Sequence, residues 1–379
     1  MENVIKHYKQ YVFCSNFLIF MPVLITIYSA RGITPSEALL IESIYSFSII
    51  LCEIPTGYLG DKIGHDRTVI LGLIGSLCCY ILFAFSYDFK SIVLVQVMLG
   101  FFSTVLSGSD VGSLSEILSK TQYKSQLVFK SIHTISMLSM CLAYVLSGVV
   151  ISLNKRGEWI LCIMGAFYFI SAIVYLSYCK GKKEIMKSLV SSKTPLHHVY
   201  HKTEEHRGSC CLPLHNILLC GMLLGIVTCS YMLSQVYYQT INISSQWFGL
   251  IYCSGCILTM LFNRYGKYYS KNTLLCIPIM LIIPVFSFKI LVLGFVICLS
   301  YIKARVEPFI VDYVMSHSHK YKATSMSMVN MLNKCFCGLI SYGLSIGISN
   351  IGFRYSMLGI FIILTSCVIV IYRSNSLEN

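Results

Sequence analysis

The chain has 379 residues, of which 56% are hydrophobic and only 12% are charged, and its mean hydropathy is +0.71. A soluble domain of this size carries about 25% charged residues, so the composition excludes soluble enzymes and nucleic-acid-binding domains and favours a polytopic membrane protein. The formal net charge of +13 fits this class, because cytoplasmic loops of membrane proteins retain Lys and Arg. We expect no catalytic residues, no cofactor and no nucleic-acid partner.

Apolar runs of about 20 residues, the length of a membrane-spanning helix, recur along almost the whole chain. The first of these runs is long enough to remain as a span, and no signal-peptide layout precedes it. A helix start is predicted at Thr34, because an N-cap threonine, a proline at the first helical position and Glu37 together form a capping box. We expect an all-α protein of about twelve spans, at 10–30, 36–56, 68–87, 91–114, 127–152, 159–179, 213–238, 245–265, 272–288, 290–315, 323–349 and 353–373.

Lysine and arginine are distributed unevenly over the two sides of these spans. With the N-terminus inside, 20 of the 29 fall in cytoplasmic segments, six fall outside and three lie within spans. This bias predicts that both termini lie in the cytoplasm, in a protein of the cell (inner) membrane. The longest polar stretch, 180–212, predicts a cytoplasmic linker between six-helix bundles at 1–179 and 213–379. Two six-span halves are expected of secondary transporters.

Histidine and cysteine residues gather in the predicted linker, at His197, His198, His201, His206, Cys210 and Cys211. These residue types suit soft or borderline metal ions, but their spacing matches no compact site, and we expect a solvated linker without metal. Cys253 and Cys256 have the spacing of a redox or metal pair. They lie in an apolar run, where we expect them to act as small packing residues.

Seven ionisable side chains lie at least four residues from either end of a predicted span, and these seven fall in only five of the spans. They are Glu42, Asp110, His133, Lys303, Arg305, Glu307 and Lys334. A charge in hydrocarbon costs about 2.5–3.5 kcal/mol even on insertion scales, so these groups must face protein or water. The pattern therefore indicates an internal aqueous path, which favours a transporter over a membrane anchor.

The charges of the predicted tenth and eleventh spans lie near mid-bilayer depth. Glu307 follows Lys303 by one helical turn, so the two either neutralise one another or face a substrate. Arg305 and Lys334 leave a cationic excess at the depth where secondary transporters bind substrate. The excess favours an anionic solute, which Arg305 would bind through two hydrogen bonds. His133 is a further candidate for substrate binding, with hydrogen-bonded packing as the alternative.

Proton coupling needs a carboxyl or histidine that titrates in a dry place. Glu42 and Asp110 are the predicted proton-coupling residues, and Glu307 is the next candidate. The alternative for Glu42 is a neutral carboxyl packed against another helix.

The segment Gly57-Tyr58-Leu59-Gly60-Asp61-Lys62-Ile63-Gly64-His65-Asp66-Arg67 lies between the second and third predicted spans. It resembles the signature loop of the major facilitator superfamily, Gly-x-Leu-Ala-Asp-Arg-x-Gly-Arg-Lys, at the place in the topology where that loop belongs. The preceding Glu53-Ile54-Pro55-Thr56 resembles the end of helix 2 in bacterial efflux members of the family. The resemblance implies two six-helix bundles, alternating access and export.

The predicted gate and loop residues are Gly57, Asp61, Gly64, His65, Arg67 and Glu116. By the resemblance, Asp61 forms a charge latch with a neighbouring helix end, with an ordinary solvated turn as the alternative. Gly57 and Gly64 permit unusual backbone angles at a tight turn. His65 and Asp66 stand where the family pattern has basic residues, and a histidine there suggests a latch that responds to cytoplasmic pH.

These patterns together predict a monomeric secondary active transporter in the lipid bilayer. It would export a small organic solute, with an anion favoured by the charge count, in exchange for protons. An importer of an organic anion or sugar, and a non-transporting receptor on the same fold, remain alternatives. The fifth predicted span lacks the Gly-Pro-rich motif of many drug/proton antiporters, which counts against multidrug export.

Overall fold

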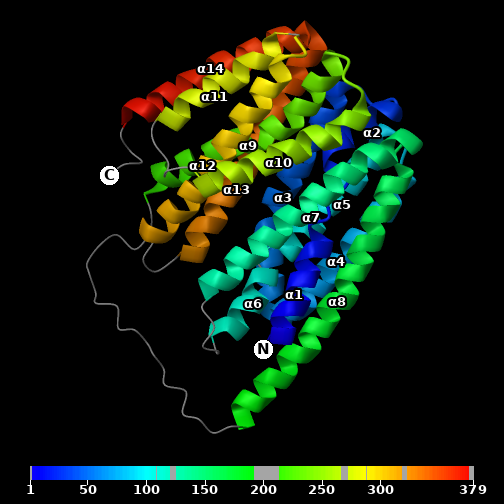
Figure 1. Cartoon of the computed structure of the whole chain (residues 1–379), viewed down its shortest axis with the longest axis vertical. Helices are drawn as coiled ribbons and strands as arrows, with labels where there is room; N and C mark the ends of the chain where they lie inside the picture. The colour runs from blue at the N-terminus through cyan, green and yellow to red at the C-terminus, as the bar shows by residue number, and fades with distance from the viewer. Residues whose placement is uncertain are drawn as a thin grey trace.

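The computed structural model describes residues 2–107, 109–119, 125–191, 213–265, 272–286, 288–317 and 322–374. Every regular element within these ranges is helical, as the sequence predicts (Figure 1). The N-terminal half contains α1 (Glu2–Ser15), η1 (Met21–Val23), α2 (Leu24–Ala30), α3 (Pro35–Ile63), α4 (His65–Ala84), α5 (Phe89–Leu106), α6 (Ser109–Ser119), α7 (Ser125–Leu153) and α8 (Glu158–Ser191). The C-terminal half contains α9 (Leu214–Thr240), η2 (Ser245–Trp247), α10 (Phe248–Tyr265), α11 (Asn272–Ile282), η3 (Ile283–Val285), α12 (Leu291–His317), α13 (Lys322–Ile351) and α14 (Phe353–Ser374).

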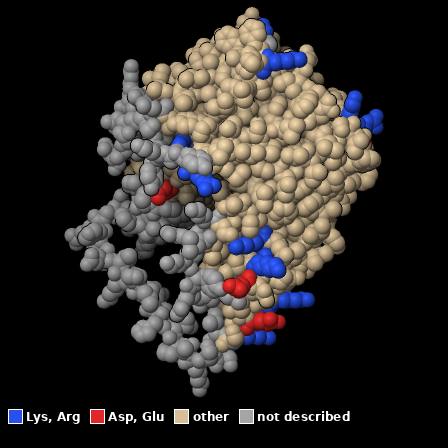
Figure 2. Space-filling view, viewed as in Figure 1, with Lys and Arg blue, Asp and Glu red and all other residues tan. Residues whose placement is uncertain are grey.

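The outer surface has the character of a membrane protein. Eight helices of the described chain are long and apolar enough to cross a membrane. Large apolar side chains such as Leu142, Phe169 and Ile173 are exposed on the outside of the bundle. Figure 2 shows a wide uncharged area on one face, with charged side chains above it, below it and at its left edge. Such an area suits contact with lipid hydrocarbon, so the chain is a multi-pass membrane protein.

Local sequence signals explain several helix boundaries. The capping box predicted at Thr34 is confirmed: its Oγ1 accepts from the backbone N–H of Glu37, and Glu37 accepts from the backbone N–H of Thr34 at 2.8 Å. Asp88 caps α5 in the same way, accepting from the backbone N–H of Ser91 at 3.0 Å. Both caps satisfy N–H groups that a helix start leaves without partners.

Two predicted spans are interrupted. The span expected at 10–30 divides into α1, η1 and α2, and the Asn16 side chain donates to the Val12 carbonyl at the end of α1. The span expected at 91–114 divides into α5 and α6 after Ser107, whose backbone is non-helical. Small polar residues end these helices because their side chains compete for backbone hydrogen bonds. The sixth span, in contrast, continues as α8 through Ser191, twelve residues into the polar stretch.

The two halves meet along two seams. α3 packs against α13, and α7 packs against α10 and η2. Within the N-terminal half, α4 and α1 pack on α8, and a group of four tyrosines joins α1 to α8. Figure 1 shows the C-terminal half, α9–α14, above and to the left of α1, α4, α6 and α8. The long central helices α3 and α13 thus carry residues of both halves to one shared interior.

Candidate functional site

The two halves of the protein are in direct contact at one end of the interface between them. Gln235 of α9 is fully buried, accepts from the backbone N–H of Ile25 at 3.0 Å and donates to the Met21 carbonyl at 2.8 Å. A Cβ on Gly249 of α10 would lie 2.0 Å from the Tyr144 carbonyl oxygen of α7, so the two backbones touch there. Residues of η1 and α2 in one half therefore bond directly to α9 in the other, and these contacts hold the two halves together at this end.

The opposite end of the α3–α13 seam opens into a cavity of about 280 Å³. Its walls come from the second half of α3, the end of α5 and the first half of α13. The lining side chains are Tyr45, Ile49, Ile50, Glu53, Ser103, Thr104, Ser107, Asn330, Met331, Asn333 and Lys334. We call this space the vestibule. It is amphipathic, as small-molecule sites are, with apolar walls and a few polar groups.

A smaller cavity of about 70 Å³ continues from the vestibule toward the closed end. Tyr45 and Ser103 line both cavities, and their hydroxyls lie 3.3 Å apart, so this pair forms the partition between them. Glu42 lines the smaller cavity, which we call the inner pocket, beside Gln96 and the aromatic ring of Tyr80. Met232 of α9 completes the wall, so this pocket also lies between the halves.

Glu42 is 7% exposed and makes no hydrogen bond or ion pair with any residue that the structure describes. Gln96 instead donates to the Tyr28 hydroxyl at 2.7 Å. The nearest cation in electrostatic terms is Lys334, across the seam on α13. An isolated carboxylate charge is costly in such a place. Glu42 therefore has the environment of a group that exchanges its charge with a mobile partner.

Lys334 projects from α13 toward α3 at the partition. Its ammonium lies 5.9 Å from the centre of the Tyr45 ring, and it interacts electrostatically with both Glu42 and Glu53. No carboxylate oxygen of the described chain is within 4.0 Å of it. The structure thus places one cation from the C-terminal half within electrostatic reach of two carboxyls of the N-terminal half.

A second charged group lies on α12. Lys303 and Glu307 approach to 3.9 Å, and the Lys303 ammonium stacks on the Tyr231 ring at 4.7 Å. The Lys303 side chain is 17% exposed and that of Glu307 is 41% exposed. His133 of α7 interacts electrostatically with Glu307. These contacts show the mutual pairing that the sequence left open, as a loose ion pair. A part for this pair in substrate binding stays a prediction.

Two other predicted residues lie elsewhere. Arg305 stacks on Tyr301 of its own helix at 5.6 Å and is not among the residues that line the vestibule or the inner pocket. Asp110 accepts from the Tyr11 hydroxyl at 3.5 Å, next to α1, and does not line the inner pocket that holds Glu42. Of the two residues expected to give a cationic excess, only Lys334 is among the described residues that line these two cavities, where it accompanies Glu42 and Glu53.

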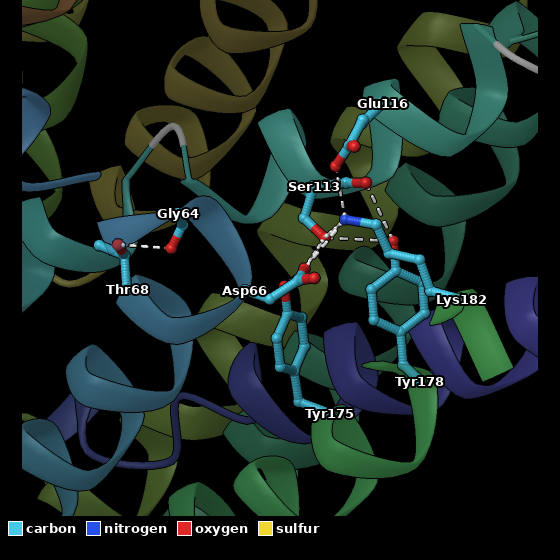
Figure 3. Close-up of polar contacts among 8 residues, drawn as sticks. All are labelled: Gly64, Asp66, Thr68, Ser113, Glu116, Tyr175, Tyr178 and Lys182. Carbon is cyan, nitrogen blue, oxygen red and sulfur yellow. Dashed lines mark hydrogen bonds and ion pairs between the residues drawn. The ribbon is translucent and has the colours of Figure 1, made fainter. Parts of the chain in front are cut away.

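The predicted latch residues also have unexpected surroundings (Figure 3). Glu116 of α6 bonds to Lys182 of α8 at 2.8 Å, and the same ammonium bonds to Asp66 of α4 at 3.0 Å. Ser113 donates to Asp66 and accepts from Lys182. The sequence placed Lys182 in a linker, whereas it is buried in the helical bundle. Arg67 is exposed.

In place of the expected eleven-residue loop, one non-helical residue, Gly64, separates α3 from α4. α3 continues through Ile63 and α4 begins at His65, so Gly57 lies inside a helix and its expected role in a turn is wrong. Gly64 has φ +90°, a conformation that favours glycine, and so it has the expected role. The His65 Nδ1 is buried without a hydrogen-bond partner among the described residues. The side chain of Asp61 and the His/Cys cluster at 197–211 lie outside the described part.

Sequence reasoning did not select Glu53, Tyr45 or Ser103 as site residues. A signal existed for the first: Glu53 follows Glu42 by eleven residues, which is three helical turns, so both carboxyls lie on one face of α3. Tyr45, three residues after Glu42, lies on that same face. The partition itself depends on the packing of α5 against α3 and has no counterpart in the sequence.

A helical membrane protein of two halves, with cavities between them that hold charged side chains, belongs to the architectural class of secondary transporters. The sequence profile of the Major Facilitator Superfamily matches residues 11–342, and the chain belongs to this family. A comparison with curated protein sequences finds no match.

Solved structures support the fold. The nucleoside transporter NupG superposes with a TM-score of 0.70 at 12% identity, over 98% of each chain. A POT family transporter in complex with 5-aminolevulinic acid gives 0.67 at 14% identity, over 99% of this chain and 96% of that one. The POT structure with a thioalcohol-conjugated peptide gives 0.69 at 14% identity, over 100% and 96%. At such identities the likeness concerns the fold alone, and the family marks the chain as a transporter rather than an enzyme.

Proposed function

We propose that this protein is a proton-coupled secondary transporter that exports a small organic solute by alternating access. The observation that supports this most directly is Glu42, a buried carboxyl that lines the inner pocket without a contacting counter-charge. A carboxyl so placed can hold either a proton or a cationic group of the solute. Competition between the two for one carboxyl couples solute movement in one direction to proton movement in the other.

The arrangement of open and closed ends supports alternating access. In this conformation the vestibule opens toward the ends of α3 and α5 and the start of α13, while Gln235 and Gly249 seal the opposite end. By the charge bias of the loops, we assign the open end to the cytoplasm, together with both termini. Rocking of the halves about the inner pocket would then open the other end.

Transport by the purified protein in liposomes tests the function. Vesicles loaded with a cell metabolite extract, under an imposed pH gradient, should lose specific solutes by mass spectrometry, and protein-free vesicles should not. Glu42→Gln should abolish the dependence on the pH gradient but keep downhill exchange. Glu184→Gln is the matched control, because Glu184 is exposed on α8. A pH response in Glu42→Gln equal to that of the wild type would refute the assignment of Glu42.

The direction of transport has a separate test. Vesicles in which the protein is inserted in one known orientation, and vesicles with the opposite orientation, are compared under the same proton gradient. Export predicts that the solute leaves the compartment that contacts the two chain termini when the opposite compartment is acidic. Accumulation in the compartment of the termini under that gradient would favour an importer.

A further inference from the structure

Charges of opposite sign face each other across the α3–α13 seam. Glu42 and Glu53 belong to α3 in the N-terminal half, and Lys334 belongs to α13 in the C-terminal half. The described lining of the two cavities therefore has two carboxyls on one wall and one ammonium on the other. A solute bound in these cavities would therefore meet negative and positive side chains at the same time.

These charges are kept apart, unlike the structural ion pairs of the same protein. Lys182 contacts Asp66 and Glu116 at 3.0 and 2.8 Å. Lys334 interacts electrostatically with Glu42 and Glu53 but contacts neither within 4.0 Å. Its ammonium lies 5.9 Å from the centre of the Tyr45 ring, at the partition. Separated charges of opposite sign leave room for groups of a ligand between them.

The chemistry of the ligand follows from what each charge requires. A carboxylate is bound well by Lys334, but a simple anion would be repelled by Glu42 and Glu53 in their ionised form and would leave their charges uncompensated. A simple cation suits the carboxyls and is repelled by Lys334. A neutral sugar satisfies neither wall, because charged groups form their strongest hydrogen bonds with charged partners.

We propose that the cavities between the halves take a zwitterionic solute, an organic molecule of amino-acid or short-peptide size with one ammonium and one carboxylate group. Its ammonium faces the α3 carboxyls and its carboxylate faces Lys334. The solute thereby joins the two halves, and their approach around it closes the vestibule. The inference rests on the proposed transport function and narrows it: the anionic group predicted from the sequence is one end of a molecule that also carries a cation.

The experiment uses the full-length protein in liposomes loaded with the same metabolite extract, and the solutes that leave are sorted by charge. Zwitterions should dominate the protein-dependent loss. Loss confined to anions, to cations or to neutral solutes would overturn the inference and leave the transport function intact. If no solute leaves through the protein, the transport function itself fails, and the inference with it.

Lys334→Gln adds a selective readout in the same assay. It should reduce the loss of zwitterions by at least about tenfold, because the carboxylate loses its charged partner, and it should spare any amines that leave. Lys183→Gln, an exposed lysine on α8, is the matched control. An equal reduction for zwitterions and for amines would show that Lys334 does not bind the carboxylate of the solute. It would contradict the proposed orientation of the solute.

Discussion

Lys182 and Asp66 form an ion pair at 3.0 Å that joins α8 to α4, with the lysine side chain buried and the carboxylate partly exposed. The same ammonium reaches Glu116 of α6 at 2.8 Å and donates to Ser113 at 3.0 Å, so one side chain ties three helices of the N-terminal half together. Tyr175 adds a hydrogen bond to Asp66 at 3.4 Å. This contact network makes α4, α6 and α8 one mechanical unit, which a half that moves as a rigid body requires.

Loss of the Lys182 charge should destabilise this unit. We expect Lys182→Met to lower the free energy of unfolding by about 2–3 kcal/mol, less than the full cost of breaking a buried pair because both carboxylates are partly exposed. Thermal unfolding of the purified protein in detergent measures the change. Lys183→Met, one residue along and exposed, should have little effect. Equal melting temperatures for the two variants would show that the network contributes nothing to stability.

The close approach of α7 and α10 predicts a cost for any side chain at Gly249. A Cβ there would lie 2.0 Å from the Tyr144 carbonyl and 2.8 Å from the Ser147 hydroxyl. Gly249→Ala should therefore destabilise the described conformation by about 1–3 kcal/mol. Gly343→Ala on α13 is the control, since nothing lies within 4 Å of its added methyl group, and it should melt at or above the wild-type temperature. Similar melting of both variants would contradict the tight seam.

Cys141 and Cys256 offer a covalent test of the same seam. Helices α7 and α10 are antiparallel where they touch, with Gly148 against Gln246 and Tyr144 against Tyr252. This register brings the two thiols into contact. In a variant that keeps only these two cysteines, copper-phenanthroline and oxygen should oxidise both thiols to a disulfide, with loss of two protons and two electrons.

A protease site inserted between 192 and 212 allows the cross-link to be read on a gel. After cleavage, the two halves should run together when oxidised and separately after reduction. The disulfide should also stop transport, because the closed end can no longer part. Full transport by the oxidised protein would contradict movement of the halves at this seam, and Cys141→Ser should prevent the cross-link.

Asp88 predicts a pH effect outside the membrane-spanning helices. Hydrogen bonds from the Ser91 side chain at 2.7 Å and from its backbone N–H at 3.0 Å hold the pKa of Asp88 below its ordinary value of 3.8. A lowered carboxyl pKa contributes stability above the unfolded-state value, and this contribution is lost as pH falls through the lower folded-state value. Asp88→Asn, which keeps the cap without titrating, should therefore lose less thermal stability than the wild type between about pH 5 and about pH 3. An unchanged pH profile would argue against the cap.

The sequence predicted the helices better than their breaks. Apolar runs and the Thr34 capping box are local signals, and the fold class and this boundary are confirmed. The interruption after Ser107 was not predicted, because hydropathy averages over about 20 residues and does not register a single non-helical residue. The long extension of α8 was missed for a related reason: its polar outer turns have no apolar period, and burial of Lys182 among three helices stabilises them instead.

The candidate site was predictable only where one helix supplies it. Lys303 and Glu307 are one turn apart, and their approach follows from helix geometry. Arg305 was expected to lie with Lys334 in the substrate site. It follows Lys303 by two residues, so it points to a different side of the helix. Its stacking partner Tyr301 lies four residues earlier on the same helix, whereas its distance from Lys334 depends on how α12 and α13 pack, which no spacing within one helix can give.

Composition, hydropathy and the Gly57–Arg67 motif by themselves determined that this chain is a helical membrane transporter of the Major Facilitator Superfamily, because those signals are carried by neighbouring residues and survive without knowledge of packing. Only the tertiary structure decided that Lys334 lies within electrostatic reach of both Glu42 and Glu53, and that Lys182 belongs to the bundle. Coulomb energy depends on distance in space, and residues nearly 300 positions apart in the chain become neighbours only when α3 and α13 pack together.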